Sequence, residues 1–379
     1  MHTDVSTQST TKPMMETPLY ALPYAIAGLS SITGRVVPMD EWAADMQVPD
    51  RKTGGVLSGA RVQEILGVHS KSWDPELFAD PNTVQGVAQR ALRSAGIAPE
   101  EVDAFLLVTC TPYEIKLGQD GFRFARGLGL RDDVVVMQLE AGCGGLARAM
   151  RMVATLNAQK VLVLAYNAAS PQVWRRGVNP LYMNNATHPQ SSLLWASAGI
   201  FSDGAAAMVL RRDESVRGFC FYSRDSLSFG DGPGFDDTIV QHPGGGVLHP
   251  PGLDSEELMC FAMSGRVIAE YYNKGMLLNH VRLLQARPEL MQQIRRLYTH
   301  QAGPAMVRRF VDIVNLPPEM APTHAERLGN LVSPCTLTLM HDDLVEGKVQ
   351  AGDMVCVSVV GAGPERGAFV LRLQASAEA

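Results

Sequence analysis

Cys143 is the residue of this chain that is best placed to act as a nucleophile. It lies in the run Gly142-Cys143-Gly-Gly, directly after an apolar stretch that is typical of a buried strand. Leu146, Met150 and Val153 then recur at helical spacing, so the sequence predicts Cys143 at a strand-to-helix turn. The backbone N–H groups and the positive end of a helix favour the reactive thiolate. The alternative is an inert cysteine in a packing turn.

Other residue patterns argue against a metal site or a phosphate loop. The Gly244-Gly-Gly246 run lacks the Lys-Ser/Thr sequel of a phosphate-binding loop and has no clear strand before it. The six cysteines form no C-x-x-C pair, so we expect reduced thiols, with neither a zinc site nor a disulfide framework. They are Cys110, Cys143, Cys220, Cys260, Cys335 and Cys356.

Length and composition indicate a large globular enzyme. The chain has 379 residues, of which 46% are hydrophobic and 19% are charged. Its net charge of −6, from 33 basic and 39 acidic residues, gives no support for nucleic-acid binding. Residues 1–17 are polar and lack the apolar core of a signal peptide, and no stretch is apolar for long enough to span a membrane. We therefore expect a soluble, cytoplasmic protein with a flexible tail over residues 1–19.

The segments that must position Cys143 alternate between apolar strands and amphipathic helices, which predicts an α/β fold with a mostly parallel sheet. In the first half the predicted strands are 20–29, 104–109, 133–139 and 160–166, and the helices are 39–46, 80–95 and 120–128. In the second half the predicted strands are 216–223, 354–360 and 367–373, and the helices are 256–276, 281–296, 305–314, 322–328 and 336–345.

Two features suggest how these segments are organised. Residues 167–198 form a long polar insert of the kind that often serves as a functional lid. Each half also ends on a turn of small residues that leads into an apolar strand, at 203–210 and at 361–373. We therefore expect two related halves, residues 20–214 with the cysteine and residues 215–379.

Four blocks, in this order, resemble β-ketoacyl-acyl-carrier-protein synthase III and its relatives in the thiolase superfamily. The resemblance runs from about Tyr20 to the C-terminus and implies a thiolase-like fold, with two related βαβαβαββ halves in an αβαβα arrangement of layers. The blocks are Glu140-Ala-Gly-Cys143-Gly-Gly, Ser202-Asp-Gly-Ala-Ala-Ala, His300-Gln-Ala, and Gly329-Asn330 with the tail Gly352-Asp-Met-Val to Gly361-Ala-Gly363.

The resemblance implies a Cys–His–Asn triad, in which Cys143 accepts an acyl group as a thioester. His300 and Asn330 would hydrogen-bond the carbonyl of the second substrate and stabilise an enolate. Backbone N–H groups of Cys143 and of the loop with Ala362 and Gly363 would form an oxyanion hole. Taken singly, His300 could be structural and Asn330 a helix cap. The resemblance implies no cofactor and no metal, only an acyl thioester of coenzyme A or acyl carrier protein as substrate.

Several positions depart from the family pattern. Gly303 and Pro304 follow His300-Gln-Ala where the family has Asn, and Ala305 stands at a usually basic position. Ala362 interrupts a glycine triplet, and the stretch that usually grips coenzyme A is represented by Gly67-Val-His69-Ser-Lys71-Ser. These departures suggest a divergent relative in polyketide, antibiotic or other secondary-metabolite biosynthesis.

Three functions stay open from the sequence. The first is decarboxylative condensation of the acyl group on Cys143 with a malonyl-type thioester. The second is acyl transfer to an alcohol, an amine or a carrier thiol, with His300 as general base. The third is a catalytically silent partner subunit with the same fold.

The resemblance also implies a homodimer, in which a loop of one subunit borders the acyl pocket of the other. That loop is residues 111–121, and Leu117 occupies the position of a gate that is bulkier in the family. Leu117 and Phe201 are therefore expected to line the acyl pocket, although Leu117 could be a local packing residue. The remaining histidines, including His188, His324 and His341, are expected to be structural or on the surface.

Overall fold

The structure, a computed structural model, describes residues 17–48, 50, 53–114, 117–173, 191–224, 240–242, 262–263 and 265–375. The Gly244–Gly246 run, His188, most of the polar insert, Cys260 and residues 1–16 of the predicted tail lie outside the described residues. Within these ranges we find no helix with the length and apolar run needed to cross a membrane.

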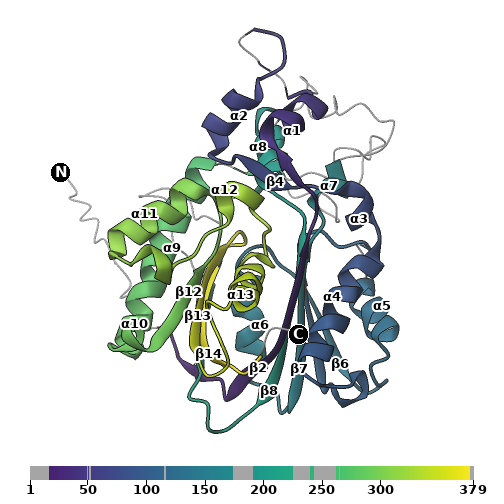
Figure 1. The fold of residues 1–379 in the computed structure, drawn as a ribbon, viewed down its shortest axis with the longest axis vertical. Helices are drawn as coiled ribbons and strands as arrows, with labels where there is room; N and C mark the ends of the chain where they lie inside the picture. The colour runs from purple at the N-terminus through teal and green to yellow at the C-terminus, as the bar shows by residue number, and fades with distance from the viewer. Residues whose placement is uncertain are drawn as a thin grey trace, which may run out of the picture.

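Ten of the described strands form one curled sheet (Figure 1). In the first half the order is β2-β8-β7-β5-β6, with β5 parallel to β6 and β7, and β8 antiparallel to β7 and β2. The strands are β2 (Tyr24–Thr33), β5 (Ala104–Thr109), β6 (Val135–Glu140), β7 (Lys160–Asn167) and β8 (Gly204–Arg212).

The second half repeats this pairing. Strands β12 and β13 are parallel, and β14 is antiparallel to both β13 and β9, as β5, β7, β8 and β2 are in the first half. The short strand β1 pairs with β9, and the end of β14 runs parallel to β2 and joins the two halves. The strands are β1 (Tyr20–Ala21), β9 (Phe219–Arg224), β12 (Ile294–Thr299), β13 (Met354–Gly361) and β14 (Glu365–Leu373).

The helices complete five layers. Helices α6 (Gly145–Val153) and α13 (Cys335–Val345) lie in the middle, between the two halves of the sheet (Figure 1). Helices α4 (Pro81–Ser94) and α5 (Gln119–Leu128) pack on the outer face of the first half. Helices α9 (Gly265–Ala286) and α11 (Pro304–Val314) cover the outer face of the second half.

The remaining elements are short. Helices α1, α2 and α8 lie together at the top of Figure 1, near the pair β3–β4. The helices are α1 (Met39–Asp45), α2 (Gly59–Leu66), α3 (Pro75–Ala79), α7 (Ala169–Val173), α8 (Ser191–Ile200), α10 (Leu290–Gln293) and α12 (Ala325–Leu328), with 3₁₀ turns at Pro99–Glu101 and Pro318–Met320. The small two-stranded sheets are β3 (Val36–Pro38) with β4 (Ser70–Ser72), and β10 (Val240–His242) with β11 (Ala262–Met263).

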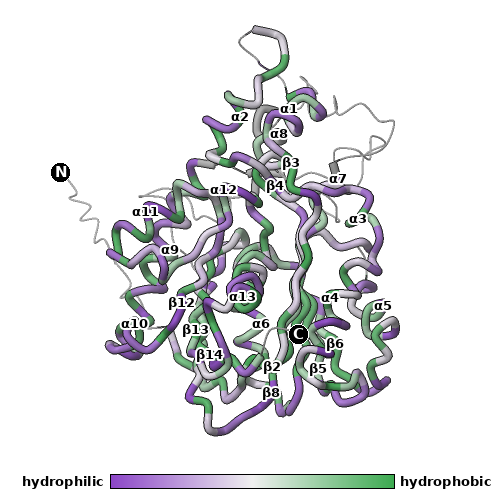
Figure 2. Tube along the Cα trace, in the orientation of Figure 1, coloured by the Kyte–Doolittle hydropathy of each residue, from purple (hydrophilic) through white to green (hydrophobic). Residues whose placement is uncertain are grey.

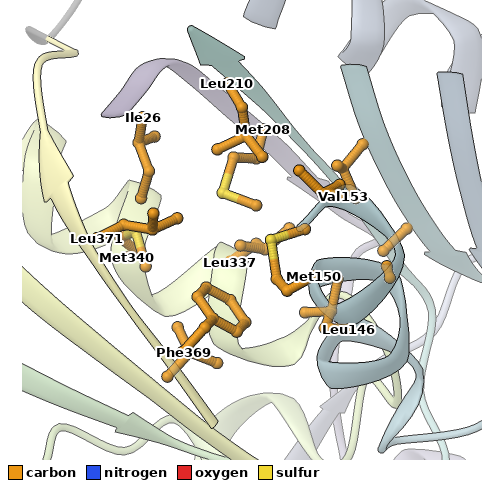
Figure 3. Close-up of a cluster of buried hydrophobic side chains, with 14 of the residues drawn as sticks. Ile26, Leu146, Met150, Val153, Met208, Leu210, Leu337, Met340, Phe369 and Leu371 are labelled. Atoms are coloured by element: carbon orange, nitrogen blue, oxygen red, sulfur yellow. The ribbon is translucent and has the colours of Figure 1, made fainter. Parts of the chain in front are cut away.

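Side chains alternate between the two faces of each strand, and this alternation decides which cluster of the core each residue joins. Alternate residues of β8 point to opposite faces, so Met208 joins the central cluster while Val209 packs under α4. In the central cluster, side chains of α6 and α13 meet those of β2, β8 and β14 (Figure 3). Figure 2 shows the hydrophobic colour along the central strands and alternating colours along the outer helices. Truncating a buried residue such as Met150 to Ala costs about 2–5 kcal/mol.

Two sequence predictions about elements are wrong. The helices expected at 256–276 and 281–296 are replaced by one helix, α9, then the short α10 and the strand β12. Arg295 and Arg296 interrupt the apolar pattern of this strand, so it was not recognised in the sequence. Leu297 and Tyr298 of the same strand are fully buried. Residues 133–139 were expected to be a buried strand, whereas β6 is the half-exposed edge of the sheet.

Candidate active site

The turn between β6 and α6 places Cys143 as the sequence predicted. The amide of Ala141 donates to the carbonyl of Thr109 (2.9 Å) and that of Gly145 to Gly142 (3.0 Å), which closes the turn tightly. A side chain at Gly144 would collide with Glu365, and one at Gly145 would collide with Val108 and Ala141. These glycines therefore allow the turn that carries Cys143 to press against β5 and β14.

His300 follows directly after β12 and is held by three contacts. Its amide donates to the carbonyl of Ser358 (3.0 Å), and its carbonyl accepts from the hydroxyl of Tyr272 (2.9 Å). Its Nδ1 lies 3.3 Å from Sγ of Cys335. The imidazole is buried, with 2% of the residue exposed, and the orientation of its ring is fixed.

Asn330 is held by its backbone and by its own side chain. Its amide donates to Ile200 (2.9 Å) and its carbonyl accepts from Ser202 (2.9 Å), so it sits beside the end of α8. Its Oδ1 accepts from the amide of Val332 (2.8 Å), whose φ of 63° is unusual for a β-branched residue. Because Oδ1 is engaged, the NH₂ group faces Cys143, with Nδ2 4.0 Å from Sγ.

Cys143, His300 and Asn330 line the same cavity, whose volume is about 400 Å³. Among the described residues that line it there is no Asp, Glu, Lys or Arg. The other lining residues are Ile65, Leu66, Ala196, Ser197, Ile200, Phe201, Ile268, Tyr271, Tyr272, Ala302, Gly303, Pro304, Ala305, Met306, Val360, Gly361 and Ala362. The three predicted triad residues therefore converge on one apolar chamber.

The electrostatics of Cys143 differ from the prediction of a stabilised thiolate. Burial raises the pKa of the Cys143 thiol well above its ordinary value; the neighbouring thiols of Cys335 and Cys110 raise it further, and the hydrogen bond from Asn330 lowers it only partly. Cys143 does lie at the start of α6, but the cost of burying a thiolate outweighs that position. Cys143 is therefore a neutral thiol in its resting state.

His300 is neutral for the same physical reason. Burial lowers the pKa of its imidazole to about 3, because the cavity cannot solvate a cation. Two neutral groups, the imidazole of His300 and the amide of Asn330, therefore stand beside the thiol of Cys143. Such groups can donate hydrogen bonds to a developing oxyanion without a charged partner.

The other predicted site residues are not all at the cavity. Ala362 lines it, and the preceding Gly361 is pressed against the cysteine turn, because a side chain at Gly361 would collide with the backbone of Gly144. Gly363 has a φ of 107° in the turn between β13 and β14 but does not line the cavity. Phe201 lines the cavity, whereas Leu117 does not and is 82% exposed.

Lys71 belongs to the stretch that departs from the coenzyme A-gripping pattern of the family, and its side chain is not exposed to a ligand. Its residue is fully buried, and its ammonium donates to the carbonyls of Ala198, Gly199 (3.1 Å) and Phe201 (2.6 Å) at the end of α8. The rings of Trp42 and Trp73 flank the cation at 4.8 and 4.2 Å. Lys71 therefore holds the end of α8, which in turn holds Asn330.

The block Ser202-Asp203 also has a structural role. The carboxylate of Asp203 accepts from the amides of Ser170 (2.8 Å) and Asp74 (2.7 Å), and burial raises its pKa to about 6. His324 is buried, which fits a structural histidine, and His341 contacts Ser31 through Nδ1 (2.9 Å). The described residues contain no cluster of three or more His, Cys, Asp or Glu side chains that could hold a metal ion.

Sequence reasoning missed the groups that orient the triad. Cys335 and Tyr272 contact His300, and the hydroxyl of Ser333 donates to the carbonyl of Gly142 (3.0 Å). Cys335 and Ser333 fall within the run that follows Asn330, so their place in the sequence was a signal. Tyr272 comes from the middle of α9, and no local pattern links it to His300.

Comparisons with known proteins find similar chains. The model described as 3-oxoacyl-[acyl-carrier-protein (ACP)] synthase III C terminal matches residues 284–373, the segment that contains His300 and Asn330. β-Ketoacyl-[acyl-carrier-protein] synthase III 3 of Streptomyces coelicolor is 26% identical over 293 residues, which are 76% of this chain and 80% of that protein. The synthase III of Clostridium perfringens strain SM101 is 23% identical over 300 residues, 76% and 82% of the two chains.

Solved structures show the same fold. The crystal structure of 3-oxoacyl-(acyl carrier protein) synthase III, FabH, from Pseudomonas aeruginosa PAO1 matches with a TM-score of 0.72 at 21% identity, over 94% of this chain and 100% of that one. OleA of Xanthomonas campestris with bound cerulenin matches with a TM-score of 0.74 at 16% identity, over 95% and 99%. The expected thiolase-like fold is therefore confirmed, and the chain is an acyltransferase that is similar to the β-ketoacyl-acyl-carrier-protein synthases III.

Proposed function

We propose that the chain loads an acyl group from a coenzyme A or acyl-carrier-protein thioester onto Cys143 and condenses it decarboxylatively with a malonyl-type thioester. The observation that carries this proposal is the convergence of a thiol, a neutral imidazole and a neutral amide on one apolar cavity of about 400 Å³. The names of the relatives, which are synthases of β-ketoacyl groups, support it.

In the loading step the thiol of Cys143 attacks the thioester carbonyl. A new carbon–sulfur bond forms, the bond to the donor thiol breaks, and the proton of Cys143 leaves with the donor thiolate. In the described part of the chain no backbone carbonyl accepts the N–H of Cys143 or Ala362. These amides, with that of Gly363, are the proposed donors to the tetrahedral oxyanion.

In the condensation step the malonyl thioester carbonyl accepts hydrogen bonds from His300 and Asn330. The bond between the carboxylate carbon and the methylene carbon breaks, carbon dioxide leaves, and the electron pair forms an enolate held by these two donors. The enolate carbon then attacks the thioester on Cys143, the carbon–sulfur bond breaks, and the sulfur leaves as a thiolate that takes up a proton from solvent. The apolar wall favours this route, because it destabilises the malonyl carboxylate relative to neutral carbon dioxide.

The test is incubation of the protein with acyl thioesters of increasing chain length, with and without a malonyl thioester. Condensation predicts a covalent acyl adduct in every productive case, and carbon dioxide with a β-ketoacyl product only when malonyl thioester is present. An adduct that passes to alcohols, amines or thiols but never yields carbon dioxide would support plain acyl transfer, with His300 as base. No adduct with any donor would support a silent subunit.

We also propose a role in polyketide or other secondary-metabolite biosynthesis. The departures at Gly303, Pro304 and Ala305 all fall on the cavity wall, so they alter the surface that meets the substrate. Such changes suggest an acyl group or a carrier different from that of the housekeeping enzymes. A preference for a branched or long acyl donor over acetyl coenzyme A would support this role, and the reverse preference would contradict it.

A homodimer is the proposed assembly. Among the described strands β6 pairs only with β5, and Val135, the first residue of β6, is 53% exposed. An apolar open edge is normally covered in a native protein. The loop that ends at α5 is braced by Asp120, which accepts from the amide of Tyr113 (2.8 Å) and the hydroxyl of Tyr166 (2.6 Å). This brace presents Leu117 outward.

Leu117 is then the proposed gate of the partner's acyl pocket. Light scattering at micromolar concentration should give the mass of a dimer, and a monomer would contradict the proposal. Leu117→Phe should slow loading of long acyl donors more than loading of short ones. If both rates change by the same factor, Leu117 does not measure chain length.

A further inference from the structure

The contact between His300 and Cys335 joins two side chains that are almost completely buried. Nδ1 of His300 lies 3.3 Å from Sγ of Cys335, and the two residues are 2% and 1% exposed. The ring of His300 also lines the cavity beside Cys143. One ring nitrogen is therefore engaged with sulfur, and the other, Nε2, is left for a ligand in the cavity.

Both partners are neutral in their resting state. The imidazole has a pKa lowered to about 3 by burial, so only one of its nitrogens carries a proton. Burial raises the pKa of the Cys335 thiol to about 12, so the sulfur keeps its proton. Two arrangements are possible: the thiol donates to Nδ1 and leaves Nε2–H, or Nδ1–H donates to sulfur and leaves Nε2 bare.

The surroundings of the sulfur separate these two arrangements. The backbone N–H groups of Gln301 and Thr336 act on the sulfur of Cys335 and partly offset the rise that burial causes in its pKa. Sulfur is a weak acceptor, so a third donor from His300 gains little there. Among the described residues, His300 is the only acceptor in reach of the Cys335 proton. The thiol proton is therefore directed to Nδ1.

We infer that Cys335 is a positioning residue that holds His300 in the tautomer with its proton on Nε2. This inference rests on the proposed condensation, because in that reaction Nε2–H must donate to the enolate oxygen. A histidine that acts as a general base would need the opposite tautomer, with Nε2 bare. The thiol of Cys335 thus selects between the two chemistries that the triad could perform.

The tautomer is measured directly by nitrogen NMR of protein labelled with ¹⁵N-histidine, with the His300 signals assigned by their loss in His300→Asn. The wild-type spectrum should show a protonated Nε2 and a bare Nδ1. Cys335→Ser keeps an O–H donor and should preserve this state, whereas Cys335→Ala should shift population to Nδ1–H. Cys356→Ala is the matched control, because Cys356 is an equally buried thiol on β13.

Kinetics supply the second readout. Loss of one hydrogen bond of this kind predicts that Cys335→Ala slows condensation by about fivefold to tenfold, while acylation of Cys143 changes by less than about twofold. Cys335→Ser should recover most of the rate, and Cys356→Ala should change neither step. The thermal stability of all three variants is also measured. A general loss of packing would lower the thermal stability and the condensation rate equally in Cys335→Ala and Cys356→Ala.

Two results would overturn the inference. One is a wild-type spectrum in which Nδ1 of His300 carries the proton. The other is a Cys335→Ala variant whose tautomer and condensation rate match those of Cys356→Ala. If Cys335→Ala does not fold, the wild-type and Cys335→Ser spectra still decide the tautomer. If the wild-type protein never loads an acyl group, the proposed function fails while the spectra test the inference separately.

Discussion

Cys143 and Cys335 lie at the starts of the two central helices, α6 and α13. The two thiols differ in their exposure and in the side chains that they contact. Cys143 stands two residues before α6, which leads to β7, and Cys335 is the first residue of α13, which leads to the equivalent strand β13. Cys143 is half-buried and lines the cavity. Cys335 is 1% exposed. Among the described residues, its side chain shares a hydrogen bond with one other side chain, that of His300.

The difference lies in the residues that flank each helix start. Gly142, Gly144 and Gly145 surround Cys143 and leave its sulfur open to a substrate, whereas Cys335 follows Ser333 and Pro334 and lies beneath the imidazole. We therefore propose that a position that the fold repeats serves as a nucleophile in one half and supports the histidine in the other. The predictions below separate these two roles.

The largest effect is expected for Cys143 itself. Cys143→Ala removes the only proposed nucleophile, so product formation should fall to background, while Cys335→Ala should keep most of the loading activity. Rates of adduct formation, measured by intact-protein mass spectrometry, compare the two variants. Equal loss in both would show that the two thiols do not have separate roles.

A smaller effect is expected for the two hydrogen-bond donors. His300→Ala and Asn330→Ala should each lower product formation by about a hundredfold or more, the loss typical of an oxyanion donor, while Cys143 is still acylated. Loading and condensation are measured separately in single-turnover experiments. Loss of loading in both variants would instead assign these residues to activation of the thiol.

The pH dependence of thiol reactivity gives the third comparison. Because burial raises the pKa of Cys143, its thiolate fraction should grow by about tenfold per pH unit from pH 7 to pH 9, without a plateau. Alkylation by iodoacetamide should follow this rise, and Cys335 should stay unmodified in the folded protein. A rate that is already constant at pH 7 would indicate a stabilised thiolate, as the sequence alone had suggested.

The smallest effect concerns stability in acid. His324 is buried, neither of its ring nitrogens has a partner among the described residues, and burial lowers its pKa to about 3 from the ordinary 6.5. As the pH falls below 6.5 the unfolded chain binds a proton that the native state refuses, so stability present above that pH is lost. His324→Leu should reduce this loss by about 1.4 kcal/mol per pH unit between roughly pH 6 and 4.

The control for acid stability is His69→Leu, at an exposed position. Urea unfolding at several pH values gives the free energy of unfolding for each variant. The control should keep the slope of the wild-type protein. An unchanged slope in His324→Leu would show that His324 is protonated or solvated in the native state.

Much of the framework could be predicted from the sequence because apolar strands and capped helices are local signals. The continuous run 104–109 is β5 with the predicted bounds, and the predicted helix 80–95 is α4, where Asp80 caps the amide of Asn82 (2.9 Å) next to Pro81. The glycines around Cys143 also predicted the strand-to-helix turn correctly. The family blocks then brought His300 and Asn330 into the same site.

The rest depended on contacts between distant segments. Lys71 is buried only because Trp42, Trp73 and the end of α8 enclose it, and no local pattern reveals that enclosure. The neutral state of Cys143 likewise follows from burial in the cavity. Burial raises the pKa of the thiol by more than the start of the helix lowers it. The strand β12 was missed because Arg296 is buried only through its ion pair with Asp343 of α13 (3.2 Å), a contact between distant segments.

The most direct measurement of the central claim is the location of the acyl group. The wild-type protein is incubated with an acyl thioester, digested with pepsin at acid pH to preserve thioesters, and mapped by tandem mass spectrometry. The account predicts one acylated site, Cys143, which is emptied when malonyl thioester is added. Acylation of Cys110, Cys335 or any residue other than Cys143, or an adduct that malonyl thioester leaves unchanged, would contradict it.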